Sequence, residues 1–288
     1  ASAASVPDGR VAPESRHHGV VLTDVSLDPT DVPAERLVEA ATRAELAGFD
    51  GVWLYDHFSG ATLGGSSIAD PWPLLGAIAV STDRVSLGPL VTNVTVRHPV
   101  HVAVASATLQ DLSGGRFILG IGAGAGPGSS FSQEMRMVGL DPEPAPSRRE
   151  MVSEAIEVIR RLWSGGGDFD GEHHALRGAE GFMVPEPPPP IIVGANGPKM
   201  SRIAGSVGDG VNLHSHEIDL AALVGVVREA EGVTPIITVE APMELPWLNG
   251  SARARMVELG VDRLILKWHG ANDDVDAIVA AGALIARD

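Results

Sequence analysis

The amino-acid sequence predicts an α/β fold in which eight strands alternate with eight helices, as in a (β/α)8 TIM barrel. The stretch Val85–Gly124 carries this prediction, because it reads as an apolar strand, a helix and a second apolar strand. Strand, helix and strand in so few residues form a βαβ unit, which builds a parallel sheet. The length of 288 residues fits a single barrel. The count and order of the elements therefore favour a closed barrel over an open doubly wound sheet.

The remaining elements follow from periodicity and from the residues that end helices and strands. In the helix of the central unit, Val100, Val104, Ala107 and Leu112 are expected to form the apolar face. Strands are predicted at 17–24, 51–57, 191–195, 210–214, 235–241 and 262–268. Helices are predicted at 33–48, 70–81, 148–163, 197–207, 220–231, 250–259 and 273–286.

Two long segments interrupt this alternation, one after the fourth strand and one before the fifth. Residues 125–147 are rich in Gly, Pro and Ser, and residues 165–190 end in a run of four prolines. An insertion on the ligand side of a barrel is typically a lid or a wall of the site, which we expect of residues 125–147. Residues 1–16 are predicted to be a disordered tail, and residues 17–288 to form a single domain.

Composition excludes several functional classes. The formal net charge of −16 argues against binding nucleic acid or an anionic membrane surface. The sequence contains no run of 18 apolar residues that could span a membrane, and its first 16 residues do not resemble a secretory signal. The sequence contains no cysteine, which excludes disulfides and thiolate catalysis. We therefore expect a cytoplasmic protein that acts on a small molecule.

Asp56 and His57 end the second predicted strand. In parallel α/β folds, the carboxyl ends of the strands form the ligand site. A histidine there can move protons near neutral pH, and an adjacent carboxylate can orient it. The alternative is a surface Asp-His pair that caps a loop. The catalytic candidates are His57 and Asp56.

The segment Gly120–Gly128 is a weak match to the dinucleotide-binding fingerprint. That fingerprint requires a helix to begin at once, and Pro127 opposes this. The preferred interpretation is that glycines such as Gly122 and Gly124 let a flat ligand lie close to the backbone.

The turn Gly194-Ala195-Asn196-Gly197 joins the fifth strand to its helix. Pro198 suits the first helical turn, and a helix amino terminus attracts anions. The sequence therefore predicts a phosphate site here, with an ordinary βα turn as the alternative. His173-His174 and the segment His214–His216 lack the spacing of a metal site, so no metal is predicted.

Four stretches together resemble the bacterial luciferase-like monooxygenase superfamily, and within it the branch that uses the deazaflavin coenzyme F420. They are GFDGVWLYDHF (48–58), VSLGPLVTNVTVRHPVHVAVASATLQDLSGGRFILGIGAG (85–124), RREMVSEAIEVIRRLW (148–163) and PPPPIIVGANGPKMSRIAGSVGDG (187–210). The resemblance implies a (β/α)8 barrel with an isoalloxazine-like ring in its mouth. It also implies a phosphate in the loop after the fifth strand, held by Gly194, Ala195, Asn196 and Gly197.

The resemblance further implies that Asp56 and His57 flank the cofactor ring. Leu90-Val91 falls where the family has a non-prolyl cis peptide behind the ring, and Asn93 lies just beyond it. One position departs from the pattern. The sugar-phosphate dehydrogenases of this branch carry a catalytic glutamate where this chain has Ala125.

The predicted function is therefore hydride transfer between coenzyme F420 and a small organic substrate, by a homodimer. His57 would carry the proton, and Asp56 would either orient His57 or contact the cofactor. A residue of the first insertion, such as Glu134, is the alternative proton source. Two other functions stay open: an FMN-dependent monooxygenase and a non-catalytic flavin-binding barrel.

Overall fold

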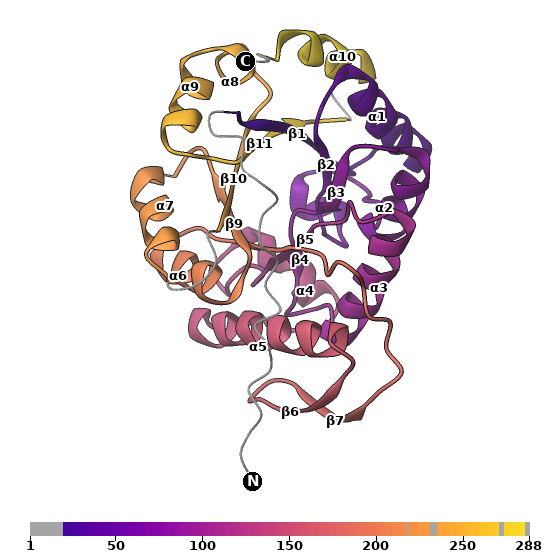
Figure 1. The fold of residues 1–288 in the computed structure, drawn as a ribbon, viewed down its shortest axis with the longest axis vertical. Coiled ribbons are helices and arrows are strands. Elements are labelled where there is room, and N and C mark those ends of the chain that lie inside the picture. The colour runs from indigo at the N-terminus through magenta and orange to yellow at the C-terminus, as the bar shows by residue number, and fades with distance from the viewer. Residues whose placement is uncertain (1–19, 218, 231–234, 271–273, 286–288) are drawn as a thin grey trace.

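The strands form one parallel sheet that curls into a barrel surrounded by helices (Figure 1). The computed structural model describes residues 20–217, 219–230, 235–270 and 274–285. The predicted tail at 1–16 lies outside the described residues. The strands of the barrel are β1 (Leu22–Leu27), β2 (Gly51–Leu54), β3 (Ser86–Pro89), β4 (Thr92–Asn93), β5 (Leu119–Gly122), β8 (Ile191–Gly194), β9 (Gly210–His214), β10 (Ile236–Pro242) and β11 (Arg263–Trp268).

The nine strands occupy the eight positions of the predicted barrel. The sheet order is β3-β2-β1-β11-β10-β9-β8-β5-β4. β3 and β4 are two halves of one barrel strand, interrupted at Leu90-Val91. Leu87 of β3 also forms a parallel bridge with Phe117, just before β5, and this bridge brings the two ends of the sheet together. The predicted (β/α)8 barrel is therefore confirmed.

Helices cover the outside of the barrel in the predicted order (Figure 1). The observed strand boundaries differ most from the predicted ones in the first two strands. β1 begins at Leu22 rather than at residue 17, and β2 ends at Leu54 rather than at residue 57. A short helix before α9 was not predicted. The helices are α1 (Ala34–Ala47), α2 (Pro71–Ser81), α3 (Pro99–Leu112), α5 (Ala145–Trp163), α6 (Pro198–Val207), α7 (Leu220–Arg228), α8 (Leu245–Asn249), α9 (Ser251–Glu258) and α10 (Val275–Leu284).

The predicted apolar face of α3 is wrong in part. Val104 and Leu112 are 46% and 48% exposed, whereas Val102 and Ala103 are buried. The buried face instead includes Ser106 and Gln110, because α3 packs between α2 and α5 and Gln110 forms hydrogen bonds with the Phe117 N–H and the Pro187 carbonyl. A hydrophobicity pattern does not reveal that small and polar side chains lie inward when a helix has neighbours on both sides.

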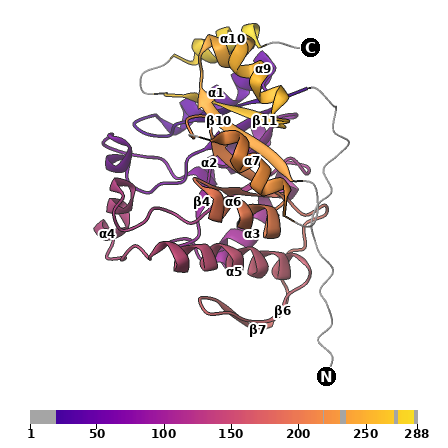
Figure 2. The ribbon, with the colours of Figure 1, turned by 90° about the vertical axis from the view of Figure 1, so that its left-hand side faces the viewer.

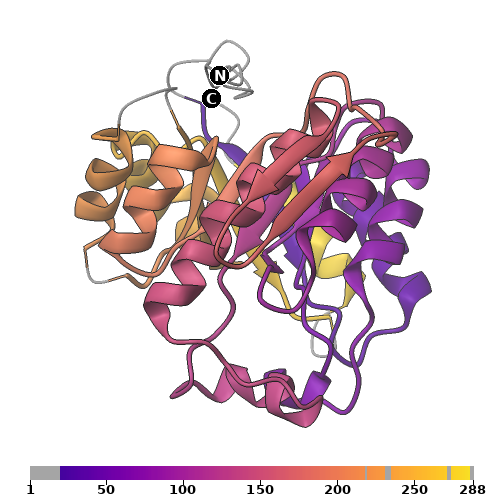
Figure 3. The ribbon, with the colours of Figure 1, turned by 90° about the horizontal axis from the view of Figure 1, so that it is seen from below.

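The two insertions lie on different parts of the barrel. The first, between β5 and α5, contains the one-turn helix η2 (Ser130–Ser132) and α4 (Gln133–Met137). α4 contacts η1 (Gly60–Leu63), which follows β2. The second contains the antiparallel hairpin of β6 (Gly167–Asp170) and β7 (Ala175–Ala179), which packs on α5 (Figure 2). Figure 3 shows the hairpin alongside α5, and its tip reaches back to Glu154, whose carboxylate accepts the backbone N–H groups of residues 172–174.

Candidate active site

A cavity of about 1000 Å³ opens at the carboxyl ends of the barrel strands. The first insertion forms part of its wall, through Ala125, Phe131 and Glu134 among others, so this insertion borders the cavity as expected. Ten of the predicted site residues line the cavity: Asp56, His57, Leu90, Val91, Asn93, Gly122, Gly124, Gly194, Asn196 and Gly197.

Ala195 is the predicted site residue that does not line the cavity. It is 2% exposed, and its N–H donates to the carbonyl of Asn212, 3.0 Å away. This bond belongs to the pairing of neighbouring strands, so the Ala195 amide is already used. The structure therefore does not bring Ala195 to the cavity with the other predicted site residues.

Asp56 and His57 have different partners, although they are adjacent in sequence. The guanidinium of Arg97 holds the Asp56 carboxylate with three hydrogen bonds of 2.8 to 3.0 Å. Burial opposes the charge on Arg97, but the hydrogen bond and charge of Asp56 raise the pKa of the guanidinium above its ordinary value. The Asp56 side chain is only 3% exposed. Asp56 therefore does not orient His57, and that predicted alternative is wrong.

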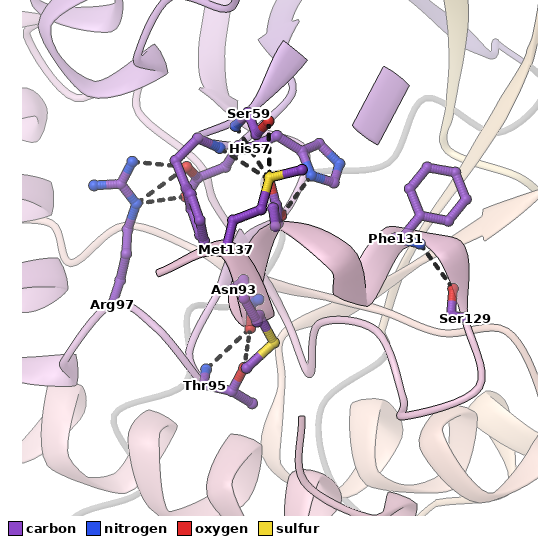
Figure 4. A network of polar contacts seen from close by, with 12 residues as sticks. His57, Ser59, Asn93, Thr95, Arg97, Ser129, Phe131 and Met137 are labelled. Carbon is purple, nitrogen blue, oxygen red and sulfur yellow. Dashed lines mark hydrogen bonds and ion pairs between the residues drawn. The ribbon is translucent and has the colours of Figure 1, made fainter. Parts of the chain in front are cut away.

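The partner of His57 is a carboxylate from the first insertion. His57 Nδ1 lies 2.8 Å from Oε1 of Glu134. The other carboxylate oxygen of Glu134 accepts the backbone N–H groups of Phe58 and Ser59. Figure 4 shows this network, with Arg97 on one side and Phe131 on the other.

Leu90-Val91 is the centre of the wall formed by β3 and β4. Its peptide bond is cis, as the family resemblance implied. The Val91 side chain packs against Gly122 and Gly194 of the neighbouring strands. A Cβ atom added to Gly122 would lie 2.5 Å from Val91 Cγ2, and a Cβ atom added to Gly194 would lie 2.9 Å from the same carbon. Side chains on these two strands would therefore displace Val91. Gly122 and Gly194 therefore leave room for the Val91 side chain, and Val91 faces the cavity.

Asn93 and Gly124 are matched in a similar way. The Asn93 side chain accepts hydrogen bonds from the backbone N–H and the hydroxyl of Thr95. Gly124 has φ +58, and a Cβ there would lie 2.5 Å from the Asn93 amide. Both features require glycine at 124, because this φ is unfavourable for other residues.

The predicted phosphate turn leads into the amino terminus of α6. Gly197 is the residue before the helix and has an extended backbone with open space where a Cβ would stand. The N–H groups of the first helical turn have no partner within the helix and attract anions. Lys199, at the second helical position, also lines the cavity.

A polar cluster lines the same cavity at the ends of β2, β9, β10 and β11. Glu240 is 3% exposed and accepts a hydrogen bond of 2.8 Å from the Tyr55 hydroxyl. His214 Nδ1 lies 2.9 Å and Lys267 Nζ 3.4 Å from its other oxygen. Burial alone would raise the pKa of Glu240, but His214, Lys267 and Tyr55 together lower it. Burial, and secondarily the Glu240 charge, raise the pKa of Tyr55 well above its ordinary value.

Comparisons with a protein-family model and with solved structures agree with the barrel fold. The model of the luciferase-like monooxygenase family matches residues 16–232. The chain belongs to this family. Its solved structural neighbours include an F420-dependent secondary alcohol dehydrogenase in complex with an F420-acetone adduct, at 20% identity and a TM-score of 0.76, with 92% of this chain and 98% of that chain covered.

Curated relatives of this luciferase-like chain include several F420-dependent enzymes. An F420-dependent glucose-6-phosphate dehydrogenase of Amycolatopsis mediterranei is 37% identical over 60% of this chain and 51% of its own length. A 5,10-methylenetetrahydromethanopterin reductase of Archaeoglobus fulgidus is 30% identical over 80% of this chain and 68% of its own length. An F420-dependent hydroxymycolic acid dehydrogenase of Mycobacterium tuberculosis is 34% identical over 77% of this chain and 59% of its own length. The chain spans about half the length of the first of these relatives.

The sequence alone did not reveal several residues of the luciferase-like site. Arg97 lies in the loop after β4, and its role follows from the bonds to Asp56. Glu240 and Lys267 lie within predicted strands, where the only available signal was a charged residue in an apolar run. Tyr55 precedes Asp56-His57 and reaches the polar cluster.

Two further properties concern only the described residues. No group of three His, Asp or Glu side chains there is arranged to hold a metal ion. No helix in that part of the chain is both long enough and apolar enough to cross a membrane.

Proposed function

We propose that this protein is an oxidoreductase that uses coenzyme F420 for hydride transfer to or from a small organic substrate. The observation that carries the proposal is the likeness to relatives named as F420-dependent, which extends over 77% of the chain in one of them. The cavity supports it, because a half-buried apolar wall at Val91 and an anion-attracting helix terminus at Gly197 border the same space.

The residues present fit such a cofactor. Val91, backed by Gly122 and Gly194, would support one face of a flat ring. Asn196, Gly197 and the first turn of α6 would hold the phosphate, with Lys199 supplying a positive charge. When bound, F420 supplies the hydride carrier, while the protein supplies orientation and proton transfer.

His57 is the proposed proton carrier among the residues that line the cavity. Its side chain is 24% exposed, and the ring nitrogen that does not face Glu134 is available to a substrate. Asp56 is bound to Arg97, so its proposed role is to shape the wall beside His57 and to contact the cofactor. The cluster around Glu240 would bind a polar substituent of the substrate.

Titration of the purified protein with F420 and, separately, with FMN tests the proposal by fluorescence. We expect F420 to bind at least tenfold more tightly than FMN. The reduced cofactor is then supplied under oxygen, because reduced flavin reacts readily with oxygen whereas the deazaflavin reacts poorly. Tighter binding of FMN together with transfer of an oxygen atom to an organic substrate would instead identify a monooxygenase. Tight F420 binding with no turnover on any acceptor would identify a non-catalytic barrel.

We also propose a homodimer and a cytoplasmic location. The absence of cysteine from the sequence supports the location. Light scattering at several protein concentrations tests the dimer, and a monomer at all concentrations would contradict it.

A further inference from the structure

Glu134 is held in place more firmly than a surface residue of an insertion would be. It is 3% exposed, although it lies on α4, a helix of only five residues. Its Oε2 accepts two backbone N–H groups, at 3.1 Å from Phe58 and 3.3 Å from Ser59. Both donors directly follow His57, so the carboxylate is fixed to the same segment that carries the histidine.

The other carboxylates of the cavity have partners of their own. Asp56 is bound by Arg97, and Glu240 by Tyr55, with His214 and Lys267 close by. Asp28 lies 3.7 Å from His269. Glu134 is the carboxylate that reaches His57, at 2.8 Å from Nδ1.

The contact between Glu134 and His57 Nδ1 bears on which nitrogen of His57 carries the proton. When the carboxylate is ionised it only accepts hydrogen bonds, so His57 then donates from Nδ1. In the neutral imidazole, Nε2 then keeps its lone pair. Because Nδ1 is the nitrogen that faces Glu134, Nε2 is the ring nitrogen without that contact. A histidine in this tautomer can take a proton at Nε2, and the carboxylate stabilises the resulting cation.

We propose that Glu134 is the positioning residue of His57, which fixes the Nδ1–H tautomer and leaves Nε2 for proton transfer to and from substrate. The expected effect on kcat rests on the proposed function, whereas the expected tautomer of His57 does not. It also gives the first insertion a role, because α4 carries the carboxylate to the end of β2. Met135, the next residue, is 2% exposed and holds this part of α4 against the barrel.

Glu134→Gln is the most informative variant because it keeps the size of the side chain. Its amide oxygen can still accept from Phe58 and Ser59, which places the NH2 group opposite His57. That arrangement requires Nδ1 to accept and moves the ring proton to Nε2. The exposed Glu143 of the same insertion does not line the cavity, so Glu143→Gln is the matched control for loss of one negative charge.

The first measurement uses the cofactor-free protein. Nitrogen-15 NMR of labelled histidines, assigned by comparison with His57→Gln, reports the tautomer of His57. We expect the Nδ1–H form in the wild type and in Glu143→Gln, and the Nε2–H form in Glu134→Gln. A wild-type His57 with its proton on Nε2, or a tautomer unchanged in Glu134→Gln, would overturn the inference whatever the enzyme's substrate.

The second measurement is the steady-state pH profile with F420 and a substrate that the wild type turns over. We expect Glu134→Gln to lower kcat by roughly 10²- to 10³-fold, with cofactor affinity within twofold of the wild type. The limb assigned to His57 should change in Glu134→Gln, because the ring proton has moved to Nε2, and Glu134→Asp should restore part of kcat. A residue that only tethers α4 would change thermal stability and cofactor affinity, and would leave the limb in place. If F420 does not bind, the proposed function fails while the tautomer measurement still decides the role of Glu134.

Discussion

The fit between Val91 and the glycines of the neighbouring strands makes a quantitative prediction about stability. In Gly122→Ala, the new methyl group would lie 2.5 Å from Val91 Cγ2, whereas carbon atoms in contact lie roughly 3.5–4.0 Å apart. Val91 must therefore move by about 1 Å, and overpacking of this kind costs about 1–3 kcal/mol. The lower entropy of the unfolded chain offsets about 0.5–1 kcal/mol of that cost. The expected net destabilisation is therefore about 0–2.5 kcal/mol, with a central value of about 1 kcal/mol.

The test is a double-mutant cycle read by thermal unfolding. Val91→Ala removes the colliding methyl groups, so the double variant should be more stable than the sum of the single changes predicts, by at least about 0.5 kcal/mol. For a chain of this size, each kcal/mol moves Tm by about 2–4 °C. Gly76→Ala is the control, because a Cβ there meets no atom within 4 Å and α2 should gain stability. Additive effects of the two changes would refute the reasoning, as would a Gly122→Ala protein at least as stable as the wild type.

Three further predictions concern the cofactor, the proton and acid stability. Gly197→Val should weaken F420 binding at least tenfold in fluorescence titration with Tm unchanged, since the new side chain enters open space beside α6; unchanged affinity would exclude this turn as the phosphate site. His57→Ala should lower kcat by roughly 10²–10⁴-fold with little change in cofactor affinity, and normal turnover with an unchanged pH profile would leave His57 only as part of the wall. Burial, and secondarily the neighbouring His98, lower the pKa of His174. Below pH 6.5, the ordinary pKa of histidine, the unfolded chain therefore binds more protons than the folded chain. The folded protein should therefore lose stability as the pH falls from 6.5 through the lowered pKa of His174. Calorimetry over this pH range should show a smaller fall in Tm for His174→Phe than for the wild type.

Several features of the fold could be predicted because they depend on local pattern. Apolar runs bounded by glycines give the barrel strands, and the helical crossover between the two runs in Val85–Gly124 makes them parallel. The position of His57 at the mouth followed from strand direction alone, since the carboxyl ends of parallel strands share one side of the barrel. The hairpin β6–β7 escaped prediction because its strands are mostly exposed and lack an apolar pattern.

What the sequence by itself determined is therefore the barrel, the two insertions and ten of the residues that line the mouth, because periodicity and strand order fix them. Only the tertiary structure decided which of those residues are partners. Asp56 and His57 are neighbours in the chain, yet one is bound to Arg97 and the other to Glu134, which lies 77 positions away. The Ala195 amide is occupied by a strand that comes later in the chain. Such pairings depend on where insertions and loops fold back over the barrel, and the distances they create have no signature in local sequence.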